Sequence, residues 1–210
     1  MYLPAHFDIK DPAWVAAVIR EQPLASLITT DESGLPFVTH LPLRIESDAR
    51  DPQAPMRWLG HLARANPQCR HLQAQPRAVV TFLGPHAYMS PAVYPSLQHV
   101  PTWNYVAVHA TVQVALVHAA DDKDRLLKCL IADHEPAYAA QWRALAETYT
   151  NAMLAGIVGL ELTVTDWQCA IKVNQHRPQA REALLAAYSQ GSEHERALAA
   201  WIQRLTPPGA

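Results

Sequence analysis

Apolar and polar residues alternate along several stretches of this chain. The clearest alternation covers residues 105–117, where apolar residues occupy every second position from Val106 to Leu116. Residues 160–165 repeat the pattern. Because successive side chains of a strand point to opposite faces, this spacing predicts strands with one buried face. Further strands are predicted at 24–30, 36–45, 57–62 and 77–83, with a turn at 31–34 and a strand end at Gly84-Pro85.

Other stretches place apolar residues at helical spacing. Asp11-Pro12 predicts a helix start, because Asp can cap free amides and Pro fits the first helical position, and Pro23 ends this helix. Ser192 and Glu195 have the spacing of a capping box, which predicts a last helix. Further helices are predicted at 63–73 (starting at Asn66-Pro67), at 121–133 (capped by Asp121), at 136–155 and after 174, and loops at 48–55 and 88–103.

The order of these elements indicates the fold class. Strands cluster in the first half and return near residue 160, while helices are inserted between them and appended after them. This order predicts an α+β fold with an antiparallel sheet closed into a barrel. The chain lacks both the alternation of strand and helix and the Gly-x-Gly-x-x-Gly motif of a dinucleotide-binding fold.

Composition narrows the function classes. The 210 residues include 17 basic and 19 acidic side chains, for a net charge of −2, so no basic excess points to nucleic acid. Cys69, Cys129 and Cys169 are widely spaced, which is typical of reduced thiols in a cytoplasmic protein. No stretch approaches the roughly 18 consecutive apolar residues of a membrane helix, and no signal peptide is visible. The 11 histidines follow no metal-ligand spacing, so no metal site is expected, and no residue pattern identifies a catalytic nucleophile.

A first candidate binding segment lies where a predicted strand passes into a predicted helix. It contains His61, Arg64 and Asn66. Arginine offers a rigid fork of donors that suits phosphate, and free amides at a helix start favour an anion. The alternative is that Arg64 is a solvated surface residue and His61 an ordinary residue of the barrel.

A second candidate region combines aromatic, amide and hydroxyl groups. Such a set suits a planar heteroaromatic ligand, which needs both stacking and hydrogen bonds at its edge. The alternative is a set of core aromatic residues around a proline-rich loop. The region comprises Tyr88, Ser90, Tyr94, Trp103, Asn104 and Tyr105.

A third candidate segment follows the second alternating strand. Lys172 and Arg177 could contact a phosphate there, and Asn174 and Gln175 could contact a ring edge. The alternative is an ordinary solvated turn.

These segments resemble the PaiB-type proteins, described as FMN-binding negative transcriptional regulators of bacteria. The resemblance covers about residues 1–178 and is less close at Cys169-Ala170, Asn174 and His176, where the family usually has Gly-Lys, Ser and Asn. The matching motifs are Met1-Tyr2-Leu3-Pro4-Ala5-His6-Phe7, Gly60-His61-Leu62-Ala63-Arg64-Ala65-Asn66-Pro67, Gly84-Pro85-His86-Ala87-Tyr88, Ser90-Pro91, Tyr94-Pro95-Ser96, Val100-Pro101-Thr102-Trp103-Asn104-Tyr105, His109 and Ile157-Val158-Gly159-Leu160-Glu161.

The resemblance implies a split β-barrel over residues 1–178, with residues 179–210 as a helical extension. It also implies a homodimer that binds FMN in the groove between its subunits, with the phosphate near the segment from Gly60 to Arg64, which contains His61. A regulatory function follows from the resemblance, and a flavin-dependent oxidoreductase is the alternative. Direct DNA binding is the least supported expectation, because the chain is slightly acidic and the helices at 121–133 and 136–155 lack the turn of a helix-turn-helix motif.

Overall fold

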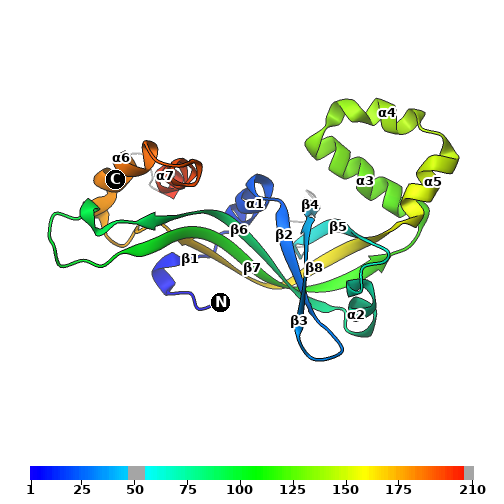
Figure 1. Ribbon diagram of the computed structural model, residues 1–210, viewed down its shortest axis with the longest axis horizontal. Helices are drawn as coiled ribbons and strands as arrows, with labels where there is room; N and C mark the ends of the chain where they lie inside the picture. Colours follow the sequence, from blue (N-terminus) through cyan, green and yellow to red (C-terminus); the bar gives the residue numbers. More distant parts are fainter. Residues whose placement is uncertain (47–54, 206–210) are drawn as a thin grey trace. The chain divides into compact units, whose positions relative to one another are not determined.

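The computed structural model describes residues 1–46 and 55–205, so the predicted loop at 48–55 lies outside the described residues except for Pro55. Its strands form one hydrogen-bonded sheet in the order β3-β2-β6-β7-β8-β5-β4, and β1 pairs with β8 (Figure 1). The strands are β1 (Asp8–Ile9), β2 (Leu24–Thr30), β3 (Pro36–Pro42), β4 (Arg44–Glu46), β5 (Arg57–Ala63), β6 (Arg77–Met89), β7 (Thr102–Val117) and β8 (Ile157–Lys172).

Helices follow or interrupt these strands. Short 3₁₀ turns lie at Ala5–Phe7, Pro91–Val93, Pro136–Tyr138 and Pro178–Ala180. The α-helices are α1 (Pro12–Glu21), α2 (Gln68–Ala74), α3 (Ala120–His134), α4 (Ala139–Ala144), α5 (Glu147–Ala155), α6 (Arg181–Ser189) and α7 (Glu193–Leu205).

The chain divides into two compact units. Unit 1 comprises Met1–Gln22, Phe82–His109 and the residues from Gln168 onward, and unit 2 comprises Pro23–Thr81 and Ala110–Trp167. The long strands β6, β7 and β8 contribute residues to both units. Helices α6 and α7 therefore group with the N-terminal segment, while the predicted boundary at residue 178 stays a prediction.

Unit 2 is built around the predicted hairpin. Strands β2 and β3 pair antiparallel from Leu24 with Pro42 to Thr30 with Pro36, and Gly34 in the turn has a φ of +85°. Alternate residues of β2 are buried, as the pattern predicted. Trp58 and Leu160 are fully buried in this unit, so the strands share one apolar core.

Unit 1 contains α1, α6 and α7 together with the remaining halves of the long strands. Asp11 caps α1 as predicted, because its Oδ1 accepts a hydrogen bond from the Ala13 amide at 2.8 Å. The capping box is confirmed as well: the Ser192 amide donates to Glu195 Oε2 at 2.7 Å and the Glu195 amide donates to Ser192 Oγ at 3.3 Å. The sequence could predict both caps because each joins residues only two or three positions apart.

Several predicted boundaries were wrong. Strand β6 continues through Gly84-Pro85 to Met89, because β7 runs close beside it: a Cβ on Gly84 would lie 3.1 Å from the Val106 carbonyl oxygen. The predicted strand 36–45 breaks at Leu43, after which β4 pairs with β5. Asp121 lies in the first turn of α3, whose cap position is Ala119.

The predicted helix 136–155 is also divided. A 3₁₀ turn, α4 and α5 replace it, because Leu145 and Ala146 adopt extended backbone between the two helices. Neither residue is a helix breaker, so the sequence carries no local signal for this break. The change of direction brings Leu154 of α5 into the core, where it is 4% exposed.

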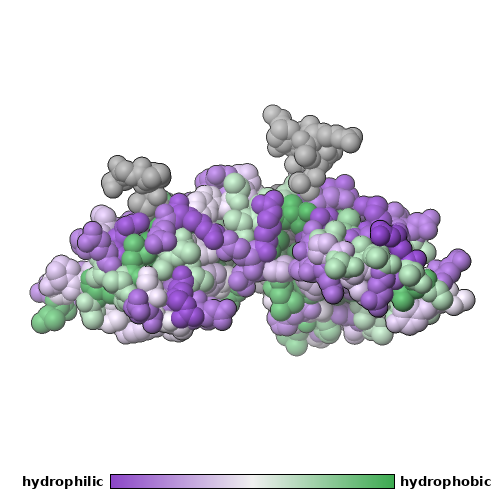
Figure 2. All heavy atoms as spheres, turned by 90° about the horizontal axis from the view of Figure 1, so that it is seen from above, coloured by the Kyte–Doolittle hydropathy of each residue, from purple (hydrophilic) through white to green (hydrophobic). Residues whose placement is uncertain are grey.

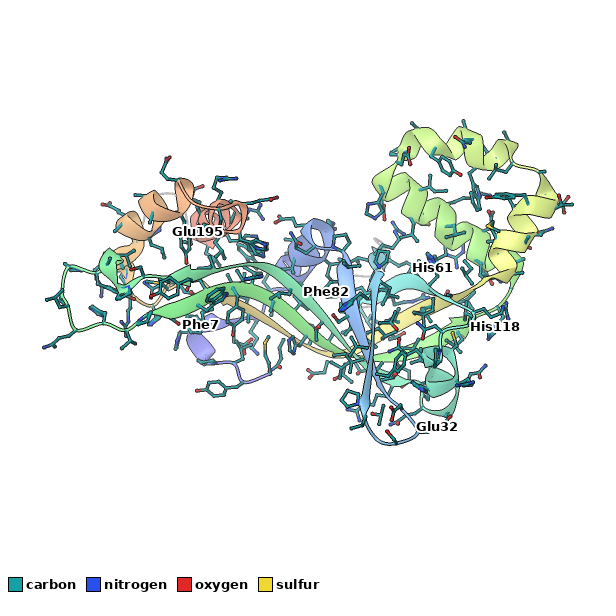
Figure 3. All side chains as sticks on the ribbon, in the orientation of Figure 1. Phe7, Glu32, His61, Phe82, His118 and Glu195 are labelled. Carbon is teal, nitrogen blue, oxygen red and sulfur yellow. The ribbon has the colours of Figure 1, made fainter. Side chains whose placement is uncertain are left out.

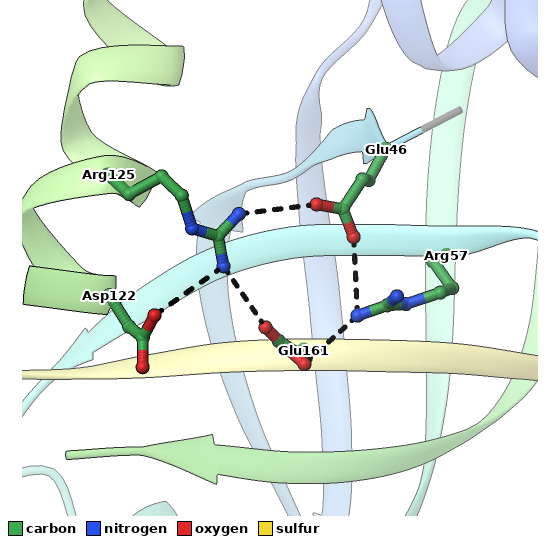
Figure 4. Close-up of polar contacts among 5 residues, drawn as sticks. All are labelled: Glu46, Arg57, Asp122, Arg125 and Glu161. Atoms are coloured by element: carbon green, nitrogen blue, oxygen red, sulfur yellow. Dashed lines mark hydrogen bonds and ion pairs between the residues drawn. The ribbon is translucent and has the colours of Figure 1, made fainter. Parts of the chain in front are cut away.

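Helix α3 is fastened to the sheet by a network of charges (Figure 4). Arg125 lies 3.4 Å from Glu46 Oε1, 3.5 Å from Glu161 and 3.9 Å from Asp122. Arg57 bridges the same two glutamates. It lies 3.0 Å from Glu161, and 3.3 Å from Glu46 Oε2, which it approaches as an ion pair without a hydrogen bond. Hydrophilic residues cover most of the face of α3, α4 and α5 at the right of Figure 2. Ionic contacts therefore supplement the few buried apolar residues of these helices.

Replacing Arg125 by glutamine is expected to lower the free energy of unfolding by about 1 kcal/mol or less, because half-exposed ion pairs are strongly solvated. In high salt, the difference in unfolding free energy between the wild type and Arg125→Gln should become smaller, because salt already screens these ion pairs in the wild-type protein. Urea unfolding at low and high salt measures both effects. Arg143→Gln on α4 removes an equal charge outside the network and serves as the control; an equal, salt-independent loss in both variants would contradict the prediction.

Candidate functional site

The twelve binding residues predicted from sequence are divided between the two units. His61, Arg64 and Asn66 belong to unit 2, and the other nine belong to unit 1. No described helix is long and apolar enough to cross a membrane. Within residues 1–46 and 55–205, no three His, Cys, Asp or Glu side chains gather as metal ligands would.

Arg64 closes the C-terminal end of α5. Its Nε donates to the Ala155 carbonyl oxygen at 2.6 Å, and its amide donates to the Gly156 carbonyl oxygen at 2.8 Å. Carbonyls at a helix end lack partners within the helix, and a cation there also meets the negative end of the helix dipole. The geometry gives Arg64 a structural role, and its predicted phosphate contact stays a prediction.

A buried lysine that the sequence analysis missed completes this end of α5. Lys123 is 3% exposed, and its Nζ donates to the Leu154 carbonyl oxygen at 2.5 Å and contacts that of Ile157 at 3.4 Å. Burial lowers the pKa of Lys123, and the nearby Arg64 lowers it further. No local pattern marks this lysine, because its partners lie more than thirty residues away along the chain.

The side chain of Asn66 and the amides at the start of α2 already form hydrogen bonds within the protein. Asn66 Oδ1 accepts from the Gln68 amide at 2.9 Å, and its Nδ2 donates to Thr39 Oγ1 at 3.0 Å. The amides of Cys69 and Arg70 donate to backbone carbonyls. The first turn of α2 therefore leaves few amides for the anion that the sequence analysis placed there.

His61 lies on β5 (Figure 3), and the strand register places it directly opposite Gly159 of β8. A Cβ on Gly159 would lie 3.0 Å from Val117 Cβ and 3.5 Å from Leu126 Cδ1, so the strand pair is closely covered on this face. His61 Nδ1 is buried and has no hydrogen-bond partner in the described structure. Burial lowers the pKa of His61, because the charged imidazolium loses water.

This lowered pKa predicts a loss of stability in acid. Below the ordinary histidine pKa of 6.5, the unfolded chain binds a proton that folded His61 resists, so the free energy of unfolding falls as pH drops below 6.5. His61→Gln should flatten this dependence, as measured by urea unfolding between pH 7 and acid. His118→Gln, at an exposed histidine, is the control. Identical pH profiles in the wild type and His61→Gln would rule the assignment out.

In unit 1, Asn104 lies in the core. It is fully buried, and its Nδ2 donates to Tyr188 Oη at 3.1 Å and to Met89 Sδ at 3.4 Å. Tyr188 of α6 in turn donates to the Tyr88 carbonyl oxygen at 3.2 Å. Burial raises the pKa of Tyr188 to about 12. Asn104 therefore ties α6 to the strands, which the sequence analysis did not anticipate, and its cofactor contact stays untested.

Two predicted aromatic side chains of unit 1 are available to a ligand. Tyr88 and Trp103 are each 50% exposed, and their rings meet edge to face with centroids 6.4 Å apart. Trp103 Nε1 donates to His86 Nδ1 at 3.3 Å. Ser90 lies next to them in sequence, but its Oγ accepts from the Ala92 amide and caps the 3₁₀ turn. The exposed rings provide a stacking surface, whereas the hydroxyl of Ser90 is partly used.

Lys172, at the end of β8, is held by hydroxyl and aromatic groups. Its Nζ donates to Thr102 Oγ1 at 2.8 Å and lies 5.8 Å and 5.9 Å from the ring centroids of Tyr105 and Phe7. Burial lowers the pKa of Lys172. Figure 3 shows Phe7 on the opposite side of the unit 1 strands from Glu195 of α7. The ring of Tyr105, a predicted site residue, therefore lies beside the ammonium group of Lys172.

The turn after β8 brings the remaining predicted residues together. Arg177 lies over the Tyr94 ring, 5.5 Å from its centroid, and its Nη1 is 3.0 Å from His99 Nδ1. Tyr94 Oη donates to Asn174 Oδ1 at 2.8 Å, and Asn174 adopts a φ of +64°. Gln175 fastens the turn, since its Nε2 donates to the Ile171 carbonyl oxygen at 2.6 Å. The turn is therefore ordered by its own side chains.

The donor set of unit 1 includes the kinds of side chain that bind a flavin mononucleotide. Lys172 and Arg177 supply positive donors for a phosphate, and Tyr88 and Trp103 supply exposed aromatic faces. Asn174 adds a buried Nδ2 that has no hydrogen-bond partner in the described structure.

Sequence comparisons place the chain among related proteins. Residues 1–166 match the family described as "Putative FMN-binding domain". The chain is 34% identical over 182 residues to "Protease synthase and sporulation protein PAI 2" of Bacillus subtilis, covering 84% of this chain and 83% of that protein. It is 27% identical over 151 residues to an uncharacterized protein of Saccharomyces cerevisiae, covering 62% of this chain and 86% of the yeast protein.

Solved structures with little sequence identity share the fold. The flavocytochrome Anf3 of Azotobacter vinelandii superposes with a TM-score of 0.61 at 17% identity, over 81% of this chain and 72% of that chain. The FAD and heme binding protein of Mycobacterium smegmatis gives a TM-score of 0.61 at 16% identity, over 79% and 73% of the two chains. The predicted α+β fold with an antiparallel split β-barrel is thereby confirmed.

Proposed function

Because the chain belongs to the FMN-binding domain family that matches residues 1–166, we propose that it is a PaiB-type flavoprotein that binds FMN and acts in regulation as a homodimer. Family membership carries the FMN assignment, and the donor set of unit 1 supports it. The regulatory part rests on the resemblance to PaiB-type proteins and on the similarity to PAI 2.

The residues of unit 1 suggest how FMN is held. Lys172 and Arg177 are proposed to bind the phosphate, because Arg64 is already bonded to the end of α5, and an aromatic ring of unit 1 is proposed to stack on the flavin. Bound FMN supplies one- and two-electron redox chemistry.

Absorbance of the freshly purified protein tests FMN binding directly. We expect flavin bands, a cofactor of FMN mass after release, and thermal stabilisation of the apoprotein by added FMN. A colourless protein whose melting temperature and flavin fluorescence do not respond to FMN would overturn the proposal.

An exposed apolar row in unit 2 supports the homodimer. The strand register aligns Val38 of β3, Ile28 of β2 and Val79 of β6, and Val38 and Val79 are 47% and 40% exposed. Apolar residues adjoining across three strands favour burial against a second copy. We expect the wild-type protein to sediment as a dimer and Val38→Glu to shift it toward the monomer. A monomeric wild-type protein at micromolar concentration would contradict this arrangement.

Regulation through direct DNA contact has the weakest physical support. The net charge of −2 provides no basic excess, and DNA affinity depends strongly on phosphate neutralisation. A gel shift with the upstream DNA of its own gene, repeated at increasing salt, tests the idea. Salt-sensitive binding would support a DNA-binding regulator, and no binding at low salt would exclude direct DNA contact.

The alternative function is a flavin-dependent oxidoreductase. Bleaching of the FMN absorbance by NADPH or NADH under anaerobic conditions would favour it. A bound flavin that neither nicotinamide reduces would favour the regulatory proposal over this alternative.

A further inference from the structure

A cleft of about 320 Å³ lies between α3, α4 and α5 in unit 2, the three helices at the upper right of Figure 1. None of the twelve predicted binding residues is among the described residues that line it. Its volume falls within the range of small-molecule pockets, about 300–1,000 Å³. Two helices each turn one face toward it, because their lining residues recur three or four positions apart. These residues are Asp121, Asp124 and Lys128 of α3, and Glu147, Asn151 and Leu154 of α5.

The break between α4 and α5 shapes this cleft. In a continuous helix, Arg143 and Glu147 would be neighbours four positions apart and would pair. Instead, Leu145 and Ala146 are extended, and both charged residues line the cleft. Neither Leu145 nor Ala146 breaks a helix by its own preference, and a departure from local preference of this kind is typical of functional sites.

Packing against the core does not account for the position of α4 and α5. Every residue of these two helices is described; none in α4 is buried, and Leu154 is the one buried residue of α5. Helices of six and nine residues are marginal by themselves, because few hydrogen bonds offset the cost of nucleation. A ligand that contacts α3, α4 and α5 together supplies the contacts that the core does not.

Trp142 of α4 forms an oriented wall of the cleft. Its Nε1 donates to Asp124 Oδ1 at 2.8 Å, and Lys128 Nζ lies 2.5 Å from Asp124 Oδ2. The indole N–H, the carboxylate and the ammonium group are therefore satisfied by one another. What the indole offers to a ligand is its apolar ring, beside the side chains of Leu145 and Leu154.

The remaining polar side chains of the cleft lack partners within the described structure. Asp121 and Glu147 are carboxylates, Arg143 is a cation, and none of the three forms a side-chain hydrogen bond or ion pair with a described residue. All three are exposed, so a ligand reaches them from solvent. A purely anionic ligand would face two carboxylates, and a purely cationic one would face Arg143. A ligand that carries both charges beside an apolar group meets neither repulsion.

We propose that this cleft binds a free amino acid with an apolar side chain. Arg143 binds the carboxylate of the ligand, and Asp121 and Glu147 bind its ammonium group. The side chain of the ligand packs on the ring of Trp142 and on the two leucines. This site depends on neither FMN nor the regulatory function proposed above.

L-leucine and L-phenylalanine are the probes. We expect each to release or absorb heat in a calorimetric titration and to raise the melting temperature as its concentration rises. Phenethylamine lacks the carboxylate of phenylalanine, and 3-phenylpropanoate lacks its ammonium group. Each should bind about 10-fold more weakly than L-phenylalanine, as expected for a lost charged hydrogen bond.

Two variants locate the site. Arg143→Gln and Glu147→Gln should each weaken the affinity for both amino acids about 10-fold. Arg20→Gln on α1 and Glu182→Gln on α6 remove the same charges at exposed positions outside the cleft, and they should bind like the wild type. Circular dichroism and the melting temperature without ligand establish that each variant is folded. If one variant does not fold, the other carries the test.

Three outcomes overturn the proposal. The first is no response to either amino acid at millimolar concentration. The second is equal affinity in the wild type and both cleft variants, or an equal loss in the control variants, either of which shows that the ligand is not held in the cleft. The third is binding of phenethylamine or 3-phenylpropanoate as tight as that of L-phenylalanine, which shows that the site does not select a ligand with both charges. A colourless protein that binds L-leucine keeps this site and loses the FMN assignment, so the two proposals fail separately.

Discussion

Replacing Trp201 by alanine is expected to lower the free energy of unfolding by about 3–5 kcal/mol. Trp201 of α7 is 1% exposed, and its ring centroid lies 5.6 Å from that of Trp14 in α1. Arg204 covers the same ring at 4.9 Å and pairs with Glu21 at the end of α1. Alanine would leave a large cavity between the two helices, which the surrounding residues can fill only in part. Urea unfolding followed by circular dichroism measures the loss.

Trp103→Ala is the matched control for this experiment. Trp103 is also in unit 1 but is 50% exposed, so its replacement should cost about 1 kcal/mol or less in the absence of a ligand. Equal losses in the two variants would show that α7 does not contribute to the core of unit 1. A much larger loss of unfolding free energy in Trp201→Ala than in Trp103→Ala would show that the segment after residue 178 belongs to the folded unit.

Gly60→Ala is the second change with a large expected effect. A Cβ on Gly60 would lie 2.5 Å from Leu43 Cδ2 and 3.1 Å from the Pro42 carbonyl oxygen. Leu43 is 1% exposed and the Pro42 oxygen belongs to the backbone, so neither neighbour can move away easily. Overpacking of this kind costs about 1–3 kcal/mol, and we expect the upper part of that range. The melting temperature and urea midpoint should both fall.

Gly34→Asn separates this packing effect from the general cost of losing a glycine. Gly34 has a φ of +85° but open space around it, and asparagine tolerates that conformation. We expect a loss below about 1 kcal/mol. If Gly60→Ala costs no more than Gly34→Asn, the close approach of β5 to the β3–β4 corner is not what requires glycine at position 60.

The sequence predicted some residues of the turn after β8 but missed the neighbours that contact them. Lys172 and Arg177 were found because they lie five positions apart in one polar turn. His6, His99 and Thr102, which lie around them, come from segments far away along the chain and were not predicted as site residues, although His6 and Thr102 lie within family motifs. Within the first motif, Arg64 and Asn66 form bonds to α5, to α2 and to Thr39, so a motif that marks the family here also stabilises the fold.

The sequence by itself determined the features that depend on neighbouring residues. Alternation predicted β7, Asp11 predicted the cap of α1, and Ser192 with Glu195 predicted the start of α7. Each depends on side chains within a few positions of one another, so short-range propensity and hydrogen bonding are sufficient.

Tertiary structure alone decided the features that depend on distant partners. Pairing with β7 carries β6 through Gly84-Pro85, although both residues disfavour strands. Packing divides the helix predicted at 136–155 without a proline or glycine at the break, and it buries Lys123 against the carbonyls of α5. Packing also places the ring of His6 beside that of His176, with centroids 4.7 Å apart. Burial and long-range hydrogen bonds outweighed local preference at these positions, because each joins segments that the sequence separates by tens of residues or more.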